Sequence, residues 1–194
     1  MKKYIIIHHT AVSYDKNPDQ FQATNRYHEK KWGDDVKSSL GLYGGYHYEI
    51  AKDGTVRKFR EESEIAAAAY QKSMNHLAIH ICVDGNFDEE HPTPEQMKAL
   101  ESLVADIKSR HHTKEIHGHR WVAPKTCPGT NFTDEMINNL LVEEVDEFKE
   151  WALKHGICSD GEWDEPVTKY ESVVMLRRGL LLLKNGILEM FDNK

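Results

Sequence analysis

The sequence is short of cysteine, of long apolar runs and of long basic runs. Its three cysteines, Cys82, Cys127 and Cys158, form no Cys-x-x-Cys pair, which excludes a structural zinc site of four cysteines, and their odd number argues against a disulfide framework. The longest apolar candidate, around Leu180 to Leu183, is far too short to cross a bilayer. The net charge of −7, with no long run of Lys or Arg, argues against nucleic-acid binding. We therefore expect neither membrane insertion nor a nucleic-acid partner.

The start of the chain also lacks the features of an export signal. Met1-Lys2-Lys3-Tyr4 is followed by an apolar run that ends at His8, which is too short for a signal-peptide core, and it has no small-residue cleavage site. We therefore expect synthesis in a cytoplasm. With 39% hydrophobic and 29% charged residues over 194 positions, the composition is that of a soluble globular protein with one main domain and a small appendage.

Strand and helix patterns alternate over the first two thirds of the chain. Asp53-Gly54 supplies the positive φ that a tight hairpin turn needs, Asn17-Pro18-Asp19 is typical of a helix N-cap with proline at the first helical position, and Thr93-Pro94-Glu95-Gln96 is a capping box. Strands are predicted over residues 3–9, 46–51, 55–59 and 77–83, and helices over 17–32 and 93–108. The alternation predicts an α/β fold with a mixed central β-sheet flanked by helices.

The sequence changes character after Phe132. A helix is expected over residues 134–155, followed by a turn-rich stretch and a last apolar helix capped by Thr168. We therefore expect two domains, a main domain over residues 1–133 and a small C-terminal helical module over residues 134–194.

The segment HGHRWVAPKTCPG, residues 117–129, holds the most informative group of metal-binding side chains. Imidazole and thiolate are ligands that zinc favours, and three protein ligands with a fourth position open to water are typical of a catalytic zinc site. A third ligand would come from a distant strand, where His8 or His9 is available. Side-chain alternation cannot choose between these two, because a strand buried on both faces hides both.

Four segments, IIIHHTA, GYHYEIAKDGTV, NHLAIHICVDG and GHRWVAPKTCPG, resemble in order and spacing the motifs of phage-lysozyme-type N-acetylmuramoyl-L-alanine amidases, which share a fold with peptidoglycan recognition proteins. The resemblance covers residues 3–129, and four motifs in register are far more specific than any one of them. It implies an enzyme that cuts the amide bond between N-acetylmuramic acid and L-alanine, with bacterial peptidoglycan as its partner.

Carried over position by position, the resemblance implies a Zn2+ ion bound by His8, His119 and Cys127, with Tyr46 and Lys125 as catalytic residues beside it. Zinc lowers the pKa of bound water from about 15.7 toward about 7 and polarises the substrate carbonyl, so water would be the nucleophile. Lys125 can stabilise the negative oxygen of the tetrahedral intermediate. Tyr46 can hydrogen-bond the water or the intermediate.

Other histidines and cysteines near these motifs have structural interpretations. His9 is expected to be a hydrogen-bonded core histidine, and His117 to be structural or to orient a metal ligand. His47 should point to the opposite face of its strand from the catalytic tyrosine. Cys82 is expected to pack in the core, and Cys158 receives no chemical role.

The resemblance is incomplete at one edge of the expected cleft. Related amidases often place a further histidine just ahead of the motif that holds Asn75, where this chain has AAAAY at residues 66–70. Contacts to the substrate at this position therefore stay open.

The C-terminal segment supports two interpretations. Residues 151–178 resemble one wall-associated repeat similar to S-layer homology modules, which sit behind amidase domains in phage endolysins. This resemblance implies an endolysin that is made in the cytoplasm of its bacterial host, lyses that host and reaches the wall through a holin. The alternative is a helical hairpin that packs on the main domain or forms a homodimer through Leu180 to Leu183.

Two other functions fit parts of the pattern. Non-catalytic peptidoglycan-recognition proteins have similar folds, but such members typically lose the cysteine ligand that Cys127 supplies here. Some related phage amidases also inhibit a polymerase, a role that the acidic net charge does not support. The complete set of predicted ligands and catalytic residues favours the enzyme.

Overall fold

In the computed structural model, the described residues are 2–17, 19–111, 113 and 115–140. Five strands in this part form one sheet in the order β3-β2-β4-β1-β5. β1 pairs in parallel with β4 and β5, β2 pairs in parallel with β4, and β3 runs antiparallel to β2. The strands span Tyr4–His9 (β1), Tyr48–Ile50 (β2), Val56–Lys58 (β3), Ala78–Val83 (β4) and Glu115–Gly118 (β5). The predicted α/β class with a mixed sheet is confirmed.

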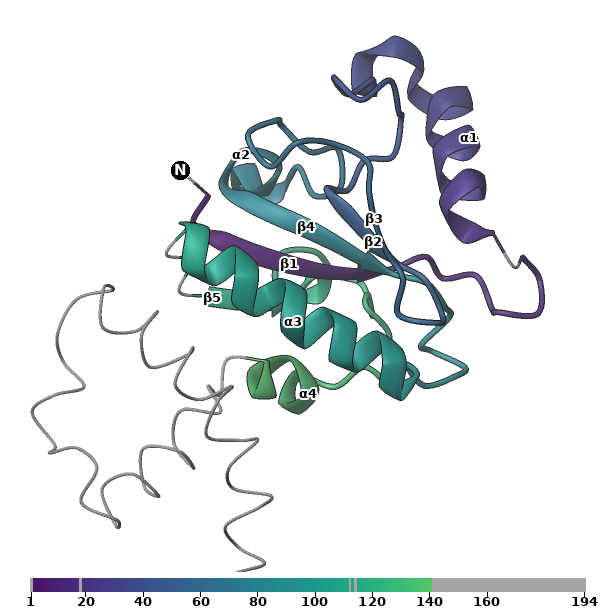
Figure 1. The fold of residues 1–194 in the computed structure, drawn as a ribbon, viewed down its shortest axis with the longest axis vertical. Helices are drawn as coiled ribbons and strands as arrows, with labels where there is room; N and C mark the ends of the chain where they lie inside the picture. Colours follow the sequence, from purple (N-terminus) through teal and green to yellow (C-terminus); the bar gives the residue numbers. More distant parts are fainter. Residues whose placement is uncertain (1, 18, 112, 114, 141–194) are drawn as a thin grey trace, which may run out of the picture. The chain divides into compact units, whose positions relative to one another are not determined.

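One face of the sheet carries the main hydrophobic core. Helix α3 (Pro94–His111) lies across this face (Figure 1). Because side chains alternate along a strand, every second residue of β1 and β4 points toward α3. The fully buried members from these three elements are Ile5, Ile7, Ile79, Ile81, Val83, Leu100, Val104 and Ile107. Burial of each aliphatic side chain contributes about 1.5–3 kcal/mol, so this face supplies much of the stability of the fold.

The opposite face of the same strands is also buried, but it is chemically mixed. Ile6 of β1 and Ala78 of β4 belong to a small apolar cluster there. Toward the carboxyl ends of the strands the side chains become His8, His80 and Cys82, all at most 2% exposed. The expected burial of the first strand on both faces is confirmed, and its second face carries functional groups rather than only apolar ones.

Helix α1 (Gln20–Trp32) begins later than the sequence predicted. Its N-cap is Asp19, whose carboxylate accepts a hydrogen bond from the backbone N–H of Gln22 at 3.2 Å. The Asn17 side chain instead accepts from the N–H of Asp19 at 3.1 Å. The predicted cap at Asn17 is therefore wrong, because a local side-chain turn precedes the helix and leaves Asp19 to cap it.

Two local signals in the sequence are confirmed. In the capping box, Thr93 Oγ1 accepts from Gln96 N–H and Gln96 Oε1 accepts from Thr93 N–H, both at 3.1 Å. In the hairpin between β2 and β3, Gly54 has φ of +82° and donates its N–H to the Ala51 carbonyl at 2.9 Å. The shorter elements are η1 (Gly33–Val36), η2 (Gln71–Ser73), α2 (Met74–Leu77) and η3 (His119–Trp121).

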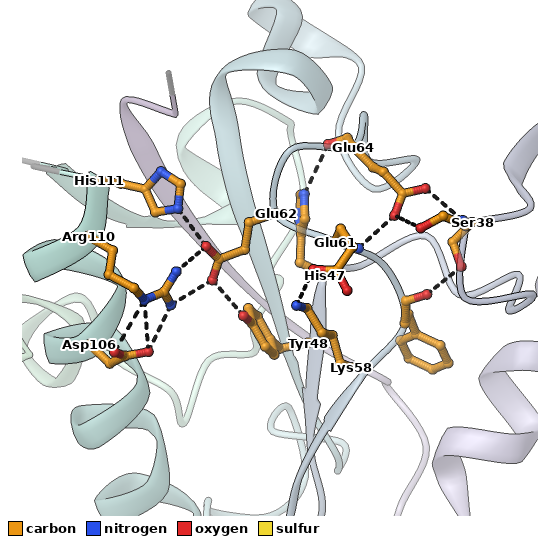
Figure 2. Close-up of polar contacts among 12 residues, drawn as sticks. Ser38, His47, Tyr48, Lys58, Glu61, Glu62, Glu64, Asp106, Arg110 and His111 are labelled. Carbon is orange, nitrogen blue, oxygen red and sulfur yellow. Dashed lines mark hydrogen bonds and ion pairs between the residues drawn. The ribbon is translucent and has the colours of Figure 1, made fainter.

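A buried carboxylate joins the loop after β3 to the end of α3 (Figure 2). Glu62 accepts hydrogen bonds from the Tyr48 hydroxyl at 2.5 Å and from Arg110 Nη2 at 2.8 Å, and His111 Nε2 lies 2.5 Å from it. Burial opposes ionisation, but the hydrogen bonds, first those from Arg110, lower the pKa of Glu62 to about 2. The network fixes the loop against the sheet, and the same loop supplies the Glu64 carbonyl that lies 3.2 Å from His47 Nε2.

The last described element is α4 (Asp134–Asn139), which Thr133 caps through a hydrogen bond from Met136 N–H at 3.2 Å. Ile137 of α4 belongs to the main hydrophobic core. The remainder of the helix predicted over 134–155 lies outside the described residues, as do Cys158 and Leu180 to Leu183, so the division at residues 133 and 134 stays a prediction. Among the described helices, none combines the length and the apolar character that a membrane span requires.

Candidate metal centre

Three side chains of types that can bind a metal, one from β1 and two from the segment after β5, meet at the carboxyl end of β1. His8 is the penultimate residue of β1, His119 is the first residue of η3 directly after β5, and Cys127 lies in the loop that follows. One potential ligand atom from each residue lies within 4.8 Å of the other two. His8 Nδ1 is 3.9 Å from Cys127 Sγ, and the His8 and His119 ring centroids are 4.6 Å apart. Within the described residues, no other group of three or more His, Cys, Asp or Glu side chains has this geometry.

Arg120 holds the loop that carries Cys127. Its backbone N–H donates to the Cys127 carbonyl at 2.8 Å. Its guanidinium donates to three more carbonyls of the same loop, those of Thr126 (3.0 Å), Gly129 (2.9 Å) and Phe132 (2.5 Å). No role was predicted for Arg120, because its partners are backbone carbonyls, which every residue carries and which a sequence pattern therefore cannot identify.

Gly129 closes this loop against the segment after β4. Its φ is +119°, and a Cβ at this position would come within 2.4 Å of the Phe87 backbone. Glycine is therefore required two residues after Cys127, where the loop passes close to a second backbone. This requirement gives a physical reason for the glycine in the segment KTCPG.

The three side chains and their surroundings fit a zinc ion. Burial, and then the charge of Lys125, lower the pKa of His119 to about 4, and burial lowers the pKa of His8 well below its ordinary value. Both rings are therefore neutral near pH 7, the form that binds metals. Burial raises the pKa of the Cys127 thiol to about 11, so a nearby cation is needed to form the thiolate.

One ring nitrogen of the cluster still lacks a partner. His119 Nε2 is buried and has no hydrogen-bond partner among the described residues. An unpaired buried polar atom costs about 1–3 kcal/mol. The cluster therefore contains a nitrogen that could bind a ligand and that no protein group of the described residues satisfies. Two imidazoles and one thiolate match the ligand set of a tetrahedral zinc whose fourth position is open.

Tyr46 lies directly beside the three side chains. Its ring centroid is 5.1 Å from that of His8, and its hydroxyl lies close enough to the Cys82 thiol for the two groups to affect each other's pKa. Burial, followed by the proximity of Cys82 and Cys127, raises the pKa of Tyr46 well above its ordinary value. The hydroxyl therefore keeps its proton and acts as a hydrogen-bond donor.

Lys125 lies at the exposed rim of the same loop. Its backbone N–H donates to the Ala123 carbonyl at 2.8 Å. Its charge is close enough to contribute to the lowered pKa values of His8 and His119. The side chain thus provides a positive charge next to the cluster without filling its centre.

Three neighbouring histidines, His9, His117 and His47, have partners outside the three-residue cluster. His9 is buried on the other face of β1, where its Nδ1 accepts a hydrogen bond from Phe87 N–H at 3.2 Å. The His117 ring stacks on Trp121 with centroids 3.8 Å apart. His47 is fully buried, and its Nδ1 accepts from the backbone N–H of His80 at 3.0 Å.

Three buried polar groups near the centre were missed by the sequence analysis or received too little weight. Cys82 was expected only to pack in the core; it is fully buried as expected, and its proximity also contributes to the raised pKa of Tyr46. His80 and Glu49 lie on the same face and are at most 1% exposed. Side-chain alternation could have indicated this arrangement, because His80 and Cys82 are two residues apart on one strand and therefore share a face.

The edge at residues 66–70 is organised by Asn75. The Asn75 side-chain oxygen accepts hydrogen bonds from the backbone N–H groups of Ala68 (3.0 Å) and Ala69 (2.7 Å). The Ala67 N–H donates to the Gly45 carbonyl at 2.8 Å, next to Tyr46. This edge therefore offers backbone, the small side chains of four alanines and the exposed ring of Tyr70, and it has no imidazole.

Comparison with known proteins gives concordant matches. The N-acetylmuramoyl-L-alanine amidase family matches residues 2–130. The endolysin of Enterobacteria phage T3 is 30% identical over 143 residues, which cover 71% of this chain and 87% of the phage protein. Peptidoglycan-recognition protein SC1a of Drosophila melanogaster is 31% identical over 141 residues, covering 69% of this chain and 71% of that protein.

A solved structure shares the fold. The N-acetylmuramoyl-L-alanine amidase LysC from Clostridium intestinale URNW superposes with a TM-score of 0.59 at 30% sequence identity, covering 73% of this chain and 87% of the LysC chain. The matched part of this chain includes all five residues predicted for the site, since they lie between residues 2 and 130.

Proposed function

Because the chain belongs to the N-acetylmuramoyl-L-alanine amidase family, we propose that it binds zinc through His8, His119 and Cys127 and uses Tyr46 and Lys125 in catalysis. The protein is an amidase of bacterial peptidoglycan, acting on the bond between N-acetylmuramic acid and L-alanine. The observation that carries the proposal is that three side chains up to 119 positions apart in sequence bring a ligand atom each within 4.8 Å of one another.

When bound, zinc supplies a Lewis acid for the amide carbonyl and lowers the pKa of a water nucleophile. The protein residues prepare that site. His8 and His119 stay neutral and Cys127 brings one negative charge, so the site retains net positive charge for the oxygen that becomes negative during hydrolysis.

Tyr46 and Lys125 act on the developing charge. Tyr46 keeps its proton and donates a hydrogen bond to the attacking water or to the oxyanion. Lys125, at the rim, stabilises the same oxyanion electrostatically and contributes most when the negative charge is fully formed. Because burial raises the pKa of Tyr46 well above its ordinary value, the tyrosine stays protonated in this role near pH 7.

The test compares zinc-loaded, chelator-treated and zinc-restored protein on purified peptidoglycan, with the released ends identified by mass spectrometry. New free L-alanine amino termini should form with the zinc-loaded protein, stop forming after chelation and return with zinc. Binding to the wall without cleavage under all three conditions would make the protein a recognition module and would remove the catalytic roles of Tyr46 and Lys125.

Matched variants separate catalysis from folding. Tyr46→Phe and Lys125→Ala should each lower kcat by about a hundredfold, the usual cost of removing one stabilising group from an oxyanion site. Tyr48→Phe is the control for the tyrosine, because Tyr48 lies on the core face and bonds Glu62. Lys98→Ala is the control for the lysine, because the Lys98 side chain is on the exposed side of α3. Equal losses in variants and controls would contradict the assigned roles.

For the rest of the chain, we propose that residues 134–194 form a wall-binding module and that the protein acts as an endolysin after release through a holin. The similarity to the phage T3 endolysin supports this biological role. A pull-down of full-length Cys127→Ser with purified walls tests binding without digestion. Sedimentation of the same protein tests the alternative, a homodimer through Leu180 to Leu183; a dimer that does not bind walls would exclude the wall-binding module.

A further inference from the structure

His80 lies next to the metal centre but is not one of its three ligands. It sits in the middle of β4 and is 0% exposed. Its ring centroid is 5.2 Å from that of His8 and 5.9 Å from that of His47. Three imidazoles are therefore buried side by side, although burial of a polar ring is costly unless its nitrogens are hydrogen-bonded.

Both nitrogens of His80 have defined partners. Nε2 lies 3.0 Å from the Met74 carbonyl oxygen, and Nδ1 lies 2.9 Å from His8 Nε2. A carbonyl oxygen only accepts hydrogen bonds, so His80 Nε2 must carry the proton of a neutral ring. His80 Nδ1 is then an acceptor, and the hydrogen in the contact between the two rings belongs to His8 Nε2.

This assignment determines the state of His8. A neutral imidazole with its proton on Nε2 has a free lone pair on Nδ1. Nδ1 is the nitrogen of His8 that faces Cys127 Sγ, at 3.9 Å. The chain of hydrogen bonds from the Met74 carbonyl through His80 thus leaves the nitrogen at the metal centre unprotonated and ready to bind.

The Met74 carbonyl, the first acceptor in this series of hydrogen bonds, is held by the backbone around α2. Met74 is the first residue of α2 and is 3% exposed. The preceding residues, Lys72 and Ser73, both have positive φ, +50° and +59°, a conformation that costs non-glycine residues energy. The backbone therefore accepts local strain in the turn that sets the Met74 carbonyl against His80.

We propose that His80 is a positioning residue that selects the Nε2-protonated tautomer of His8 and so presents His8 Nδ1 to the metal. The inference rests on the proposed function for the identity of the metal, but the tautomer of His8 is a property of the polypeptide itself. An apolar side chain at position 80 could fill the space, but it would leave His8 Nε2–H unpaired and release the ring to flip or change tautomer.

The test uses two substitutions at one position. His80→Leu keeps an apolar side chain of substantial size but accepts no hydrogen bond. His80→Gln retains a side-chain oxygen that can accept from His8 Nε2–H. Loss of a group that orients a metal ligand typically costs about 10–100-fold in metal affinity, so His80→Leu should weaken zinc binding by that factor in a chelator competition, and His80→Gln should recover a large part of it.

A readout that does not depend on zinc accompanies the affinity. In metal-free full-length protein, long-range ¹H–¹⁵N correlation spectra of the imidazoles report which nitrogen of His8 is protonated, and His8→Gln identifies the His8 signals. Wild type and His80→Gln should show protonation at Nε2. His80→Leu should show a mixture of the two tautomers.

His9→Leu is the control, because His9 adjoins His8 on the same strand but is bonded to Phe87 N–H on the other face. It should lower stability and leave both the His8 tautomer and the zinc affinity within about twofold of wild type. If His80→Leu keeps the Nε2 tautomer and full zinc affinity, or if His9→Leu changes both as strongly, the proposal is overturned. A wild-type protein that shows the Nε2 tautomer but binds no zinc would refute the proposed metal site and leave the positioning of His8 intact.

Discussion

The two faces of the central sheet are equally buried but serve different purposes. Ile7 and His8 are consecutive residues of β1, and both are at most 2% exposed. Ile7 packs in the core under α3, whereas His8 faces His119 and Cys127. The same alternation separates Ile81 from His80 and Cys82 on β4.

The difference between the faces shows that burial serves two ends here. On the α3 face, burial removes apolar area from water and stabilises the fold. On the other face, it keeps imidazoles neutral and a tyrosine protonated, so that they can bind a metal and donate hydrogen bonds. Substitutions on the two faces should therefore separate stability from activity.

The largest effect is expected from Cys127→Ser on the functional face. The variant should lose zinc and lower amidase activity by at least about a thousandfold, equivalent to about 4 kcal/mol of transition-state stabilisation. The fold should stay intact, because the apolar core under α3 does not include the centre. Zinc content, activity on peptidoglycan and circular dichroism test this comparison; an unfolded Cys127→Ser protein would show that the two faces are not independent.

The next largest effect is expected from Ile7→Ala on the core face. Removing most of a fully buried isoleucine side chain should lower the free energy of unfolding by about 3 kcal/mol, through lost burial and a residual cavity. Urea denaturation measures the loss, and activity per folded molecule should stay within about twofold of wild type. A large drop in zinc affinity would show that packing on the α3 face controls the ligand geometry on the other.

Lowering the pH should reduce the stability of the fold through its buried histidines. Burial lowers the pKa of His47 to about 2 and that of His80 to about 3, against about 6.5 in the unfolded chain. The unfolded state therefore binds more protons as the pH falls below about 6.5, and each such histidine removes about 2 kcal/mol of stability by pH 5. Denaturation of metal-free protein at pH 7 and pH 5 should show this loss.

Substitutions on the two faces should differ in how their effect on stability depends on pH. The destabilisation caused by Ile7→Ala should be the same at both pH values, since isoleucine does not titrate. In contrast, His47→Gln should make the protein less sensitive to acid than wild type, because one buried titrating group is gone. Unchanged stability of wild type between pH 7 and pH 5 would contradict the neutral state assigned to the buried histidines.

The last effect concerns Glu49→Gln, whose stability should differ from that of wild type by an amount that depends on pH. Glu49 and Asp84 are 1% and 4% exposed, and burial, then the proximity of Asp84, raises the pKa of Glu49 well above its ordinary value. A raised folded pKa gives stability that is present at low pH and lost as the pH rises through that value. Glu49→Gln should therefore be more stable than wild type at pH 6 and by a larger margin at pH 9, because the loss in wild type begins above the unfolded pKa of about 4.3 and continues up to the folded value.

Urea denaturation at the two pH values measures this gain. Glu95→Gln on the exposed side of α3 serves as the control and should show no such difference. An equal change at pH 6 and pH 9 for Glu49→Gln would mean that Glu49 is not protonated in the folded protein.

Local sequence patterns predicted the elements of the described part well where local physics decides them. The capping box at Thr93 and the turn at Gly54 formed as expected, because their hydrogen bonds and dihedral angles involve neighbouring residues. The start of α1 was wrong by two residues, because Asn17 and Asp19 both suit a cap and only the observed turn distinguishes them. The predicted C-terminal module stays a prediction.

By itself, the sequence determined the α/β class and the family, because those depend on residue types, periods and motif order. It could not decide between His8 and His9 from alternation, since both lie on a strand buried on both faces. The tertiary structure places His119 and Cys127 on the side that His8 faces, and His9 on the other. It also brought His80 and the Met74 carbonyl to His8, a contact that depends on strand pairing across 72 positions and that no local pattern encodes.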